Sequence, residues 1–237
     1  MSTPTIVFET SDYMIINKPA GWVVNDANTV THNLVIQRWL DSLKNNSLAN
    51  NREYRSGIVH RLDKETSGAL IVAKNEQSFE ALQREFKERI VKKRYIALVH
   101  GMLKEKRGEI DAPVGRLPWR RDRFGVYQNG RDAFTAYTVR DEYEKDGQKY
   151  SLVEFYPRTG RTHQIRVHAK HLGNPLVSDE FYAGRKRSRN DRIWCARLFL
   201  HANWISFIDP KSGEQVEYEV PLADDLQAAL DTLNLLD

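Results

Sequence analysis

Short runs of apolar residues, separated by polar turns, predict a chain built mostly from β-strands. β-branched and aromatic residues dominate these runs, and glycine, asparagine, aspartate or serine follows many of them, as is typical of strands bounded by turns. The pattern predicts strands at residues Ile6–Phe8, Met14–Ile16, Ala69–Ala73, Tyr95–Val99, Phe134–Val139, Tyr150–Phe155, Trp204–Ile208 and Val216–Val220.

Helical periodicity is restricted to a few segments. Apolar residues recur at helical spacing between Leu34 and Leu43, and again in the tail at Leu226, Leu230 and Leu233. Asn75 is a suitable N-cap for a helix of about 15 residues. The apolar positions of that helix are Phe79, Leu82, Phe86 and Ile90. A further helix is expected from Thr162 to Leu172, with Gly173 as its C-terminal cap.

The order of these elements favours a single α+β domain over residues 1–237. Strands outnumber helices and do not alternate regularly with them, so a doubly wound parallel sheet is not expected. The sequence therefore predicts a mixed, largely antiparallel central sheet flanked by helices and loops.

Composition adds limits on location and partners. The chain has 237 residues and 41% hydrophobic content, enough for a substantial core. No apolar run approaches the ~20 residues of a membrane span, and the N-terminus lacks a signal-peptide pattern, so a cytoplasmic protein is expected. The single cysteine, Cys195, excludes an intrachain disulfide framework and a cysteine-based zinc site.

The charge balance indicates a polyanionic partner. Lysine and arginine exceed aspartate and glutamate by 36 − 32 = +4. Two basic runs stand out, and both are expected to be loops that face phosphate, although solvated surface loops would have the same composition. The first run comprises Arg116, Arg120, Arg121 and Arg123, with Trp119 as a possible stacking surface, and the second comprises Arg185, Lys186, Arg187, Arg189 and Arg192.

Asp63 is the leading candidate for chemistry. It lies in His60-Arg61-Leu62-Asp63-Lys64-Glu65-Thr66-Ser67-Gly68, directly before the apolar run that predicts a buried strand. Arg61 and Arg166 each offer a guanidinium that could keep this carboxylate ionised and fix its direction, as a nucleophile requires. A structural ion pair would have the same sequence.

Other chemistries have weaker support. Glu65 would give a two-carboxylate glycosidase only if its separation from Asp63 were suitable, which sequence does not determine. Ser67 lacks the Gly-x-Ser-x-Gly context of a hydrolase nucleophile and is expected in a turn. His163 and His168 would lie on different sides of a helix, so polar contacts or solvent exposure are expected for them rather than metal ligation. Cys195 is expected to be buried and inert.

Six motifs occur in an order that resembles the RluA family of RNA pseudouridine synthases, and the resemblance covers nearly the whole chain. A single one of them would be a weak signal. The motifs are Asn17-Lys18-Pro19-Ala20-Gly21, His60 to Gly68, Lys93-Arg94-Tyr95-Ile96-Ala97, Gly160 to His168, Asp179-Glu180-Phe181-Tyr182-Ala183-Gly184, and Arg197-Leu198-Phe199-Leu200-His201-Ala202.

The resemblance implies an isomerase that converts uridine to pseudouridine in structured RNA, with no cofactor and no metal. It implies that Asp63 attacks C1′ of the ribose or deprotonates C2′, that Tyr95 stacks on the uracil and assists loss of the C5 proton, and that Arg166 is the salt-bridging arginine. Ile165 would help to form the uracil pocket, and Arg61 would enter the RNA stack when the target nucleotide leaves it. His60 completes the substrate-binding set implied by the motif.

Larger members of that family carry an N-terminal RNA-binding domain before the Asn-Lys-Pro motif, which here begins at Asn17. RNA contacts are therefore expected from the catalytic domain, through Arg116, Arg120, Arg121, Arg185, Lys186 and Arg187. Ribosomal and transfer RNA remain open as substrates, and a monomer is expected. A non-catalytic RNA-binding protein is the alternative from another class, and a nucleoside or glycoside hydrolase is a third.

Overall fold

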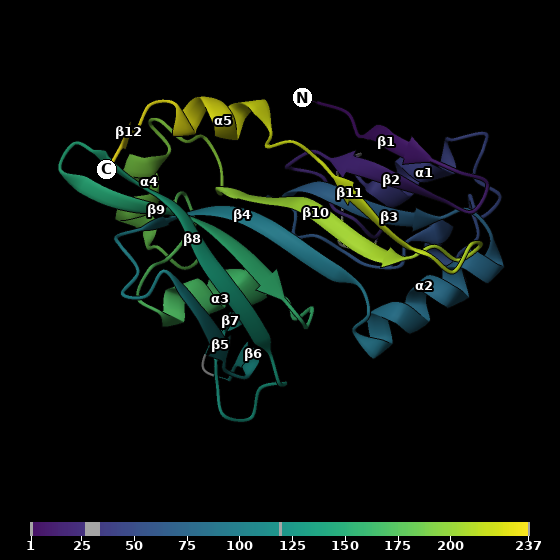
Figure 1. Ribbon diagram of the computed structural model, residues 1–237, viewed down its shortest axis with the longest axis horizontal. Helices are drawn as coiled ribbons and strands as arrows, with labels where there is room; N and C mark the ends of the chain where they lie inside the picture. Colours follow the sequence, from purple (N-terminus) through teal and green to yellow (C-terminus); the bar gives the residue numbers. More distant parts are fainter. Residues whose placement is uncertain (1, 27–33, 119, 237) are drawn as a thin grey trace. The chain divides into compact units, whose positions relative to one another are not determined.

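The computed structural model describes residues 2–26, 34–118 and 120–236 (Figure 1). The chain divides into two compact units, of which the first comprises Met1–Lys92 and Ala202–Pro221 and the second Lys93–His201 and Leu222–Asp237. Neither unit is one continuous segment. Trp119 lies outside the described residues.

The first unit contains a sheet with the strand order β1-β2-β3-β10, and β11 pairs with β10. The β1–β2, β2–β3 and β10–β11 pairs are antiparallel. The strands are β1 (Thr5–Glu9), β2 (Tyr13–Lys18), β3 (Ser67–Ala73), β10 (Leu200–Ile208) and β11 (Gln215–Glu219). The helices are α1 (Ile36–Asp41), the 3₁₀ turn η1 (Arg55–Gly57) and α2 (Glu76–Glu88).

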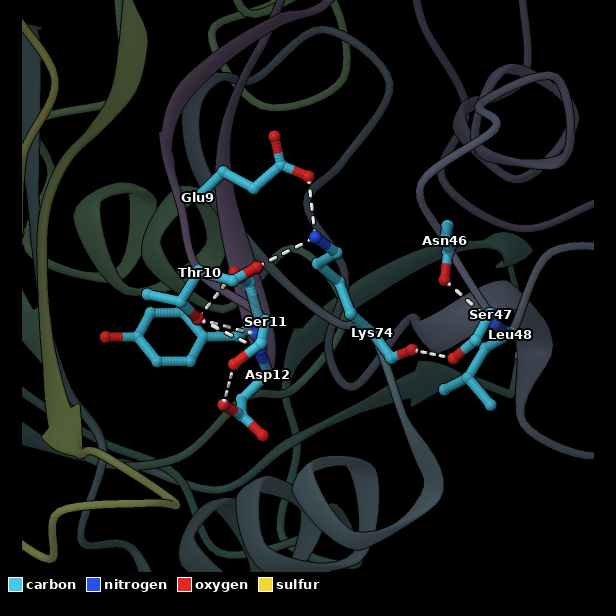
Figure 2. Close-up of polar contacts among 9 residues, drawn as sticks. Glu9, Thr10, Ser11, Asp12, Asn46, Ser47, Leu48 and Lys74 are labelled. Carbon is cyan, nitrogen blue, oxygen red and sulfur yellow. Dashed lines mark hydrogen bonds and ion pairs between the residues drawn. The ribbon is translucent and has the colours of Figure 1, made fainter.

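Side-chain oxygens organise the turn between β1 and β2, shown in Figure 2. The hydroxyl of Thr10 accepts hydrogen bonds from the backbone N–H groups of Asp12 and Tyr13, both at 3.1 Å. Nζ of Lys74 donates to the carboxylate of Glu9 at 2.7 Å and to the carbonyl of Thr10 at 2.8 Å. The hydroxyl of Ser47 donates to the carbonyl of Lys74. The turn and the end of β3 are thereby joined.

All seven residues of β3 are buried, as the apolar run predicts. The strand and α2 share a core with Tyr13, Phe79, Leu82 and Phe207. Asn75 caps α2 by accepting from the backbone N–H of Ser78 at 2.9 Å, which confirms the predicted N-cap. The predicted end of α2 is wrong: Arg89 adopts a left-handed conformation and ends the helix, so Ile90 lies beyond it and is exposed.

The second unit contains strands in the order β4-β9-β8-β12, with β5 also paired to β8 and a separate hairpin formed by β6 and β7. Its strands are β4 (Lys92–His100), β5 (Arg107–Asp111), β6 (Val114–Leu117), β7 (Arg120–Val126), β8 (Phe134–Lys145), β9 (Gln148–Pro157) and β12 (Asn234–Leu235). Its helices are α3 (Gln164–His171), α4 (Arg185–Asp191) and α5 (Asp224–Leu230).

The longest hairpin joins β8 and β9 (Figure 1). Its turn residues, Asp146 and Gly147, both have positive φ. An Asp-Gly pair is a strong signal for a two-residue turn of this kind. Apolar residues from β4, β8, β9 and α3 form one core cluster on this sheet, and a second cluster includes Cys195 and residues of α5. The predicted α+β class with a largely antiparallel sheet is confirmed; β5, β6, β7 and β12 were not predicted.

Candidate active site

A buried lysine forms a hydrogen bond to the backbone of the segment that carries Asp63. Lys18, the last residue of β2, is 0% exposed. Its Nζ donates to the carbonyls of Pro19 and Trp22, each at 2.9 Å, and of Lys64 at 3.2 Å. Three carbonyl acceptors match the three donors of an ammonium group. A buried cation therefore fixes the chain at the residue next to Asp63.

Two backbone hydrogen bonds complete this turn. The N–H of Gly21 donates to the carbonyl of Lys64 at 2.8 Å, and the N–H of Thr66 donates to the carbonyl of Asp63 at 3.1 Å. Leu62 is buried, whereas Arg61 is exposed and Asp63 is half-buried. The segment therefore anchors itself through Leu62 and presents the side chains on either side of it. Ser67 lies just after the turn, as the first residue of β3, and not within the turn as predicted.

Gly68 allows β3 to approach its neighbouring strand. Its φ is +114°, and a Cβ placed on it would lie 2.1 Å from the carbonyl oxygen of Ala202 in β10. No side chain fits that distance, and the positive φ itself favours glycine. Gly68, the last residue of the Asp63 motif, is thus required for the close approach of β3 to β10.

His60 links the same segment to the core of the first unit. Its Nε2 accepts a hydrogen bond from the backbone N–H of Ile71 at 2.9 Å, so the ring proton must be on Nδ1. The ring also stacks on Phe86, with 4.7 Å between the ring centroids. These contacts give His60 a structural role, and its contact with substrate stays a prediction.

In the second unit, Tyr95 and Ile165 meet in one apolar cluster. Ile165, on α3, is 7% exposed and belongs to the cluster, and the partly buried ring of Tyr95 packs against it. Tyr95 lies opposite Phe155 in the β4–β9 register. The fold therefore brings together two residues that are 70 positions apart and that the resemblance assigns to one uracil pocket.

Arg166 is a buried cation that pairs with a carboxylate of its own unit. The residue is 5% exposed, and its guanidinium forms two parallel hydrogen bonds with Asp179: Nε to Oδ2 at 2.8 Å and Nη2 to Oδ1 at 2.9 Å. Oδ1 of Asp179 also accepts from the N–H groups of Phe181 and Tyr182. Asp179 lies in one of the six motifs, but the sequence did not predict a role for it. Its place in the Asp-x-x-Tyr stretch was the one feature that could have indicated a role.

Aromatic rings surround the guanidinium of Arg166. Its Cζ lies 5.4 Å from the ring centroid of Phe181 and 5.1 Å from that of Tyr182. The hydroxyl of Tyr182 lies 2.8 Å from Nδ1 of His163, which has a left-handed backbone immediately before α3. Two aromatic faces and a bidentate carboxylate thus orient one arginine. His163 makes the polar contact that was predicted for it.

A buried hydrogen-bond chain fixes the start of α3. Nε2 of Gln164 donates to Oγ1 of Thr135 at 2.9 Å, and Oγ1 of Thr135 lies 2.9 Å from Nδ1 of His168. Nε2 of His168 must donate to the carbonyl of Ala112, 2.9 Å away, so Nδ1 accepts the proton of the Thr135 hydroxyl. Burial lowers the pKa of His168. This histidine is therefore neutral and structural.

The two basic runs are not loops, and that prediction is wrong for both. Arg116 lies in β6, and Arg120, Arg121 and Arg123 lie in β7 of a hairpin that packs against α3. Arg185, Lys186, Arg187 and Arg189 lie in α4. The first run has regular backbone because β6 and β7 pair with each other, and the second because it forms a helix that buries Ser188 and Asp191.

The basic side chains on the two elements differ in their surroundings. Arg116 and Arg120 are exposed, and Cζ of Arg116 lies 5.4 Å from the ring centroid of Phe124. Arg123 donates to the carbonyl of Phe181 and so ties the hairpin to the segment beside Arg166. Arg185, Lys186 and Arg187 are all exposed on α4.

Within the described ranges, no group of three histidine, cysteine, aspartate or glutamate residues is placed to hold a metal ion. Cys195 is 1% exposed, and burial raises the pKa of its thiol to about 11, so the predicted buried position is confirmed. None of the described helices has the length and apolar character needed to cross a bilayer.

Comparisons with known proteins show which proteins the chain resembles. A family model described as RNA pseudouridylate synthase matches residues 12–171. The chain is 38% identical over 96% of its length to the uncharacterized RNA pseudouridine synthase YlyB of Bacillus subtilis, spanning 72% of that protein. It is 40% identical over 98% of its length to ribosomal large subunit pseudouridine synthase D of Nitrosomonas europaea, spanning 65% of it.

A solved structure has a similar fold. Human RNA pseudouridylate synthase domain containing 1 aligns with 99% of this chain and 89% of its own, at a TM-score of 0.72 and 29% identity. The chain therefore spans about two thirds of the length of the curated relatives but nearly all of the solved domain.

Proposed function

The chain belongs to the RNA pseudouridylate synthase family, and from this premise we propose that it isomerises uridine to pseudouridine in RNA, with Asp63 as the catalytic residue. The observation that carries the proposal is the match over residues 12–171, a range that contains Asp63, Tyr95 and Arg166. The hydrogen bonds to the carbonyls of Asp63 and Lys64 support it, because a carboxylate that acts on one atom needs a fixed position.

The reaction rearranges bonds within one nucleotide. The bond between N1 of uracil and C1′ of ribose breaks, the base turns, and a bond forms between C5 and C1′. The proton of C5 is lost to solvent and N1 gains one, so the product is an isomer of the substrate. Asp63 supplies either covalent attack at C1′ or removal of the C2′ proton.

Three residues of the second unit take supporting roles in this proposal. Tyr95 stacks on the uracil and assists loss of the C5 proton, Ile165 forms an apolar wall of the base pocket, and Arg166 provides positive charge for the carboxylate of Asp63. The association of Tyr95 and Ile165 with one apolar cluster supports a shared pocket, and the pairing with Asp179 gives Arg166 a fixed direction.

The target nucleotide must leave the RNA stack, because C1′ and the base edge are inaccessible inside a helix. Arg61, which is exposed beside Asp63, fills the vacated space in this proposal. Three arginines of the β6–β7 hairpin and three basic residues of α4 contact phosphate in this proposal. These residues are Arg116, Arg120, Arg121, Arg185, Lys186 and Arg187. His60 supports the segment that carries Asp63 through its contacts with Ile71 and Phe86.

Ribosomal RNA is the proposed substrate class. The name of the Nitrosomonas europaea relative specifies the large ribosomal subunit, which favours ribosomal over transfer RNA for this chain. We place the reaction in the cytoplasm and in a monomer, in which RNA is recognised by the same domain that carries Asp63.

Release of tritium from RNA labelled at C5 of uracil tests the proposal. We expect the wild-type chain to release tritium from ribosomal RNA taken from cells that lack the gene. Asp63→Asn should abolish release while leaving RNA binding within about twofold. Glu65→Gln is the matched control, because it removes a carboxylate two residues away and should retain release.

The alternatives predict other results. If wild-type protein binds ribosomal and transfer RNA but releases no tritium from either, the non-catalytic RNA-binding function is correct. If free uracil is liberated, and Glu65→Gln is as inactive as Asp63→Asn, the protein is a hydrolase.

A further inference from the structure

One face of the second unit has a pocket with a volume of about 220 Å³. It is lined by Glu180, Arg185, Ser188, Arg189 and Arg192. A water molecule occupies roughly 30 Å³ of liquid, so this volume holds a phosphate group with water around it. The lining residues come from α4 and from the segment that follows Asp179.

The three arginines lie on one side of α4 and its C-cap. Their spacing is i, i+4 and i+7, which places them within one sector of a helix with 3.6 residues per turn. Lys186 and Arg187 fall outside that sector. Along the helix and its C-cap, Arg185, Arg189 and Arg192 therefore lie on the side of the pocket, and Lys186 and Arg187 lie on the outer side.

The inner side of α4 is polar and anchored. Ser188 and Asp191 are 2% and 3% exposed. Oδ2 of Asp191 accepts from the backbone N–H of Ser178 at 2.9 Å and lies 3.0 Å from Nε2 of His100. These contacts hold the backbone of α4, from which the three arginines project.

The charge of the pocket suits a phosphate. Three arginines and Glu180 give a net charge of 3 − 1 = +2. Glu180 is 3.9 Å from Arg192, and their side chains are 58% and 42% exposed, so this ion pair is long and weak. Within the described ranges, Arg185 and Arg189 pair with no carboxylate. Guanidinium groups converging on one volume are a suitable donor set for phosphate oxygens.

We propose that this pocket binds one backbone phosphate of the RNA substrate through Arg185, Arg189 and Arg192, with Glu180 as a competing anion. The proposal rests on the proposed function, because it takes RNA as the ligand. It also gives a route to the active site: Glu180 directly follows Asp179, whose carboxylate holds Arg166. A phosphate held here fixes the RNA beside the segment that orients that arginine.

The salt dependence of RNA binding tests the number of phosphates. The probe is a fluorescein-labelled 30-nucleotide fragment of ribosomal RNA, titrated with the full chain at a series of salt concentrations. Arg185→Gln with Arg189→Gln should weaken binding at least about tenfold. It should lower the slope of log K against log salt by about 0.8, the value for one phosphate.

Adding Arg192→Gln should change the slope little further, because the three arginines share one phosphate. A fall of about 2.4 for the triple variant would mean three separate contacts and would overturn the proposal.

The matched control is Lys186→Gln with Arg187→Gln, which removes the same charge from the outer side of the same helix. We expect it to weaken binding less than the pocket pair does at every salt concentration. Equal losses from the two pairs would mean that only net charge matters, and would refute the pocket. Thermal melting of each variant checks that α4 remains folded.

Glu180→Gln gives a test in the opposite direction. Removing the competing carboxylate should tighten RNA binding by up to about fivefold. Inorganic phosphate should displace the RNA probe less effectively from the pocket variants than from the wild-type chain. If inorganic phosphate binds the wild-type chain but the pocket variants bind RNA normally, the pocket serves a free anion and the proposal is wrong.

Failure here is distinguishable from failure of the enzymatic function. RNA binding is measured without turnover. If the wild-type chain releases tritium but the pocket variants bind RNA normally, the pocket proposal fails and the enzymatic function stands. Conversely, the pocket can be confirmed in a chain that releases no tritium.

Discussion

Among single residues, Asp179 shows how a buried charge is made tolerable. The guanidinium of Arg166 is nearly inaccessible to water, and it donates hydrogen bonds to both carboxylate oxygens of Asp179, whose side chain is 0% exposed. A buried ion without its partner would be strongly unfavourable. Asp179 is therefore required for the stability of the segment as well as for the direction of Arg166.

Asp179→Ala should lower the free energy of unfolding by about 3 to 5 kcal/mol, because it removes the bidentate carboxylate partner of buried Arg166. The matched control is Asp225→Ala, which breaks a similar bidentate pair with Arg197 whose carboxylate is 51% exposed. Solvent screens that pair, so a loss of no more than about 1 kcal/mol is expected. Urea denaturation measures both, and equal losses would contradict the interpretation.

His168 predicts a pH dependence of stability. Burial lowers its pKa in the folded state below 6.5, whereas the unfolded chain titrates near that ordinary value. As the pH falls below 6.5, the unfolded state binds a proton before the folded state does, so the free energy of unfolding decreases. Above 6.5 this contribution is constant.

The measurement compares urea midpoints from neutral pH downward for the wild-type chain and for His168→Asn. The variant should be less stable at neutral pH, because it disturbs the contacts with Thr135 and Ala112. The free energy of unfolding of the variant should decrease less steeply than that of the wild-type chain as the pH is lowered. Parallel curves for the two proteins would remove His168 as the source.

At the scale of the element, β3 depends on a glycine that its sequence pattern did not explain. The apolar run after Gly68 predicts a buried strand, but the approach of Ala202 from a segment more than a hundred residues away sets the requirement for glycine. Ordinary strand propensity would disfavour glycine at this position.

Gly68→Ala should cost about 3 kcal/mol or more, since it adds both backbone strain and a clash with a carbonyl oxygen. Gly213→Ala is the control: Gly213 also has positive φ, at +74°, but its Cβ would meet nothing within 4 Å. A cost of about 1 kcal/mol is expected there. Thermal and urea unfolding distinguish the two effects, and similar costs would contradict the role of Ala202.

The helix α4 shows why one element was misassigned from sequence. Hydrophobic periodicity identifies a helix by its apolar stripe, but the buried side chains of α4 are Ser188 and Asp191. Their partners, such as the N–H of Ser178, belong to a distant part of the chain. The hairpin of β6 and β7 was missed for a related reason, because its charged side chains gave no alternating pattern.

At the scale of the whole molecule, each of the two units is built from two separate stretches of the chain. Ile205, Phe207 and Val220 belong to the core that also contains Tyr13 and Phe79. They come from the stretch Ala202–Pro221, which follows almost all of the second unit in the chain. The first unit is therefore completed only when residues near the C-terminus are in place.

This organisation predicts the behaviour of a fragment. Residues 1–92 alone should fail to fold, because β3 lacks its neighbour β10 and the core lacks three buried side chains. Circular dichroism and thermal melting test this expectation. A cooperative transition for the isolated fragment would contradict it.

The sequence by itself determined the family, the fold class and most strands. The six motifs resembled the family that the match over residues 12–171 confirms, and local rules sufficed for the N-cap at Asn75 and the buried run of β3. These features are readable because they depend on neighbours in the chain.

Only the tertiary structure decided which polar residues are partners. The pairing of Arg166 with Asp179, the three carbonyls around Lys18 and the division of the basic run on α4 depend on groups brought together from separate segments. Hydrogen bonds and ion pairs are short-ranged and directional, so residue type and spacing leave their partners undetermined until the chain has folded.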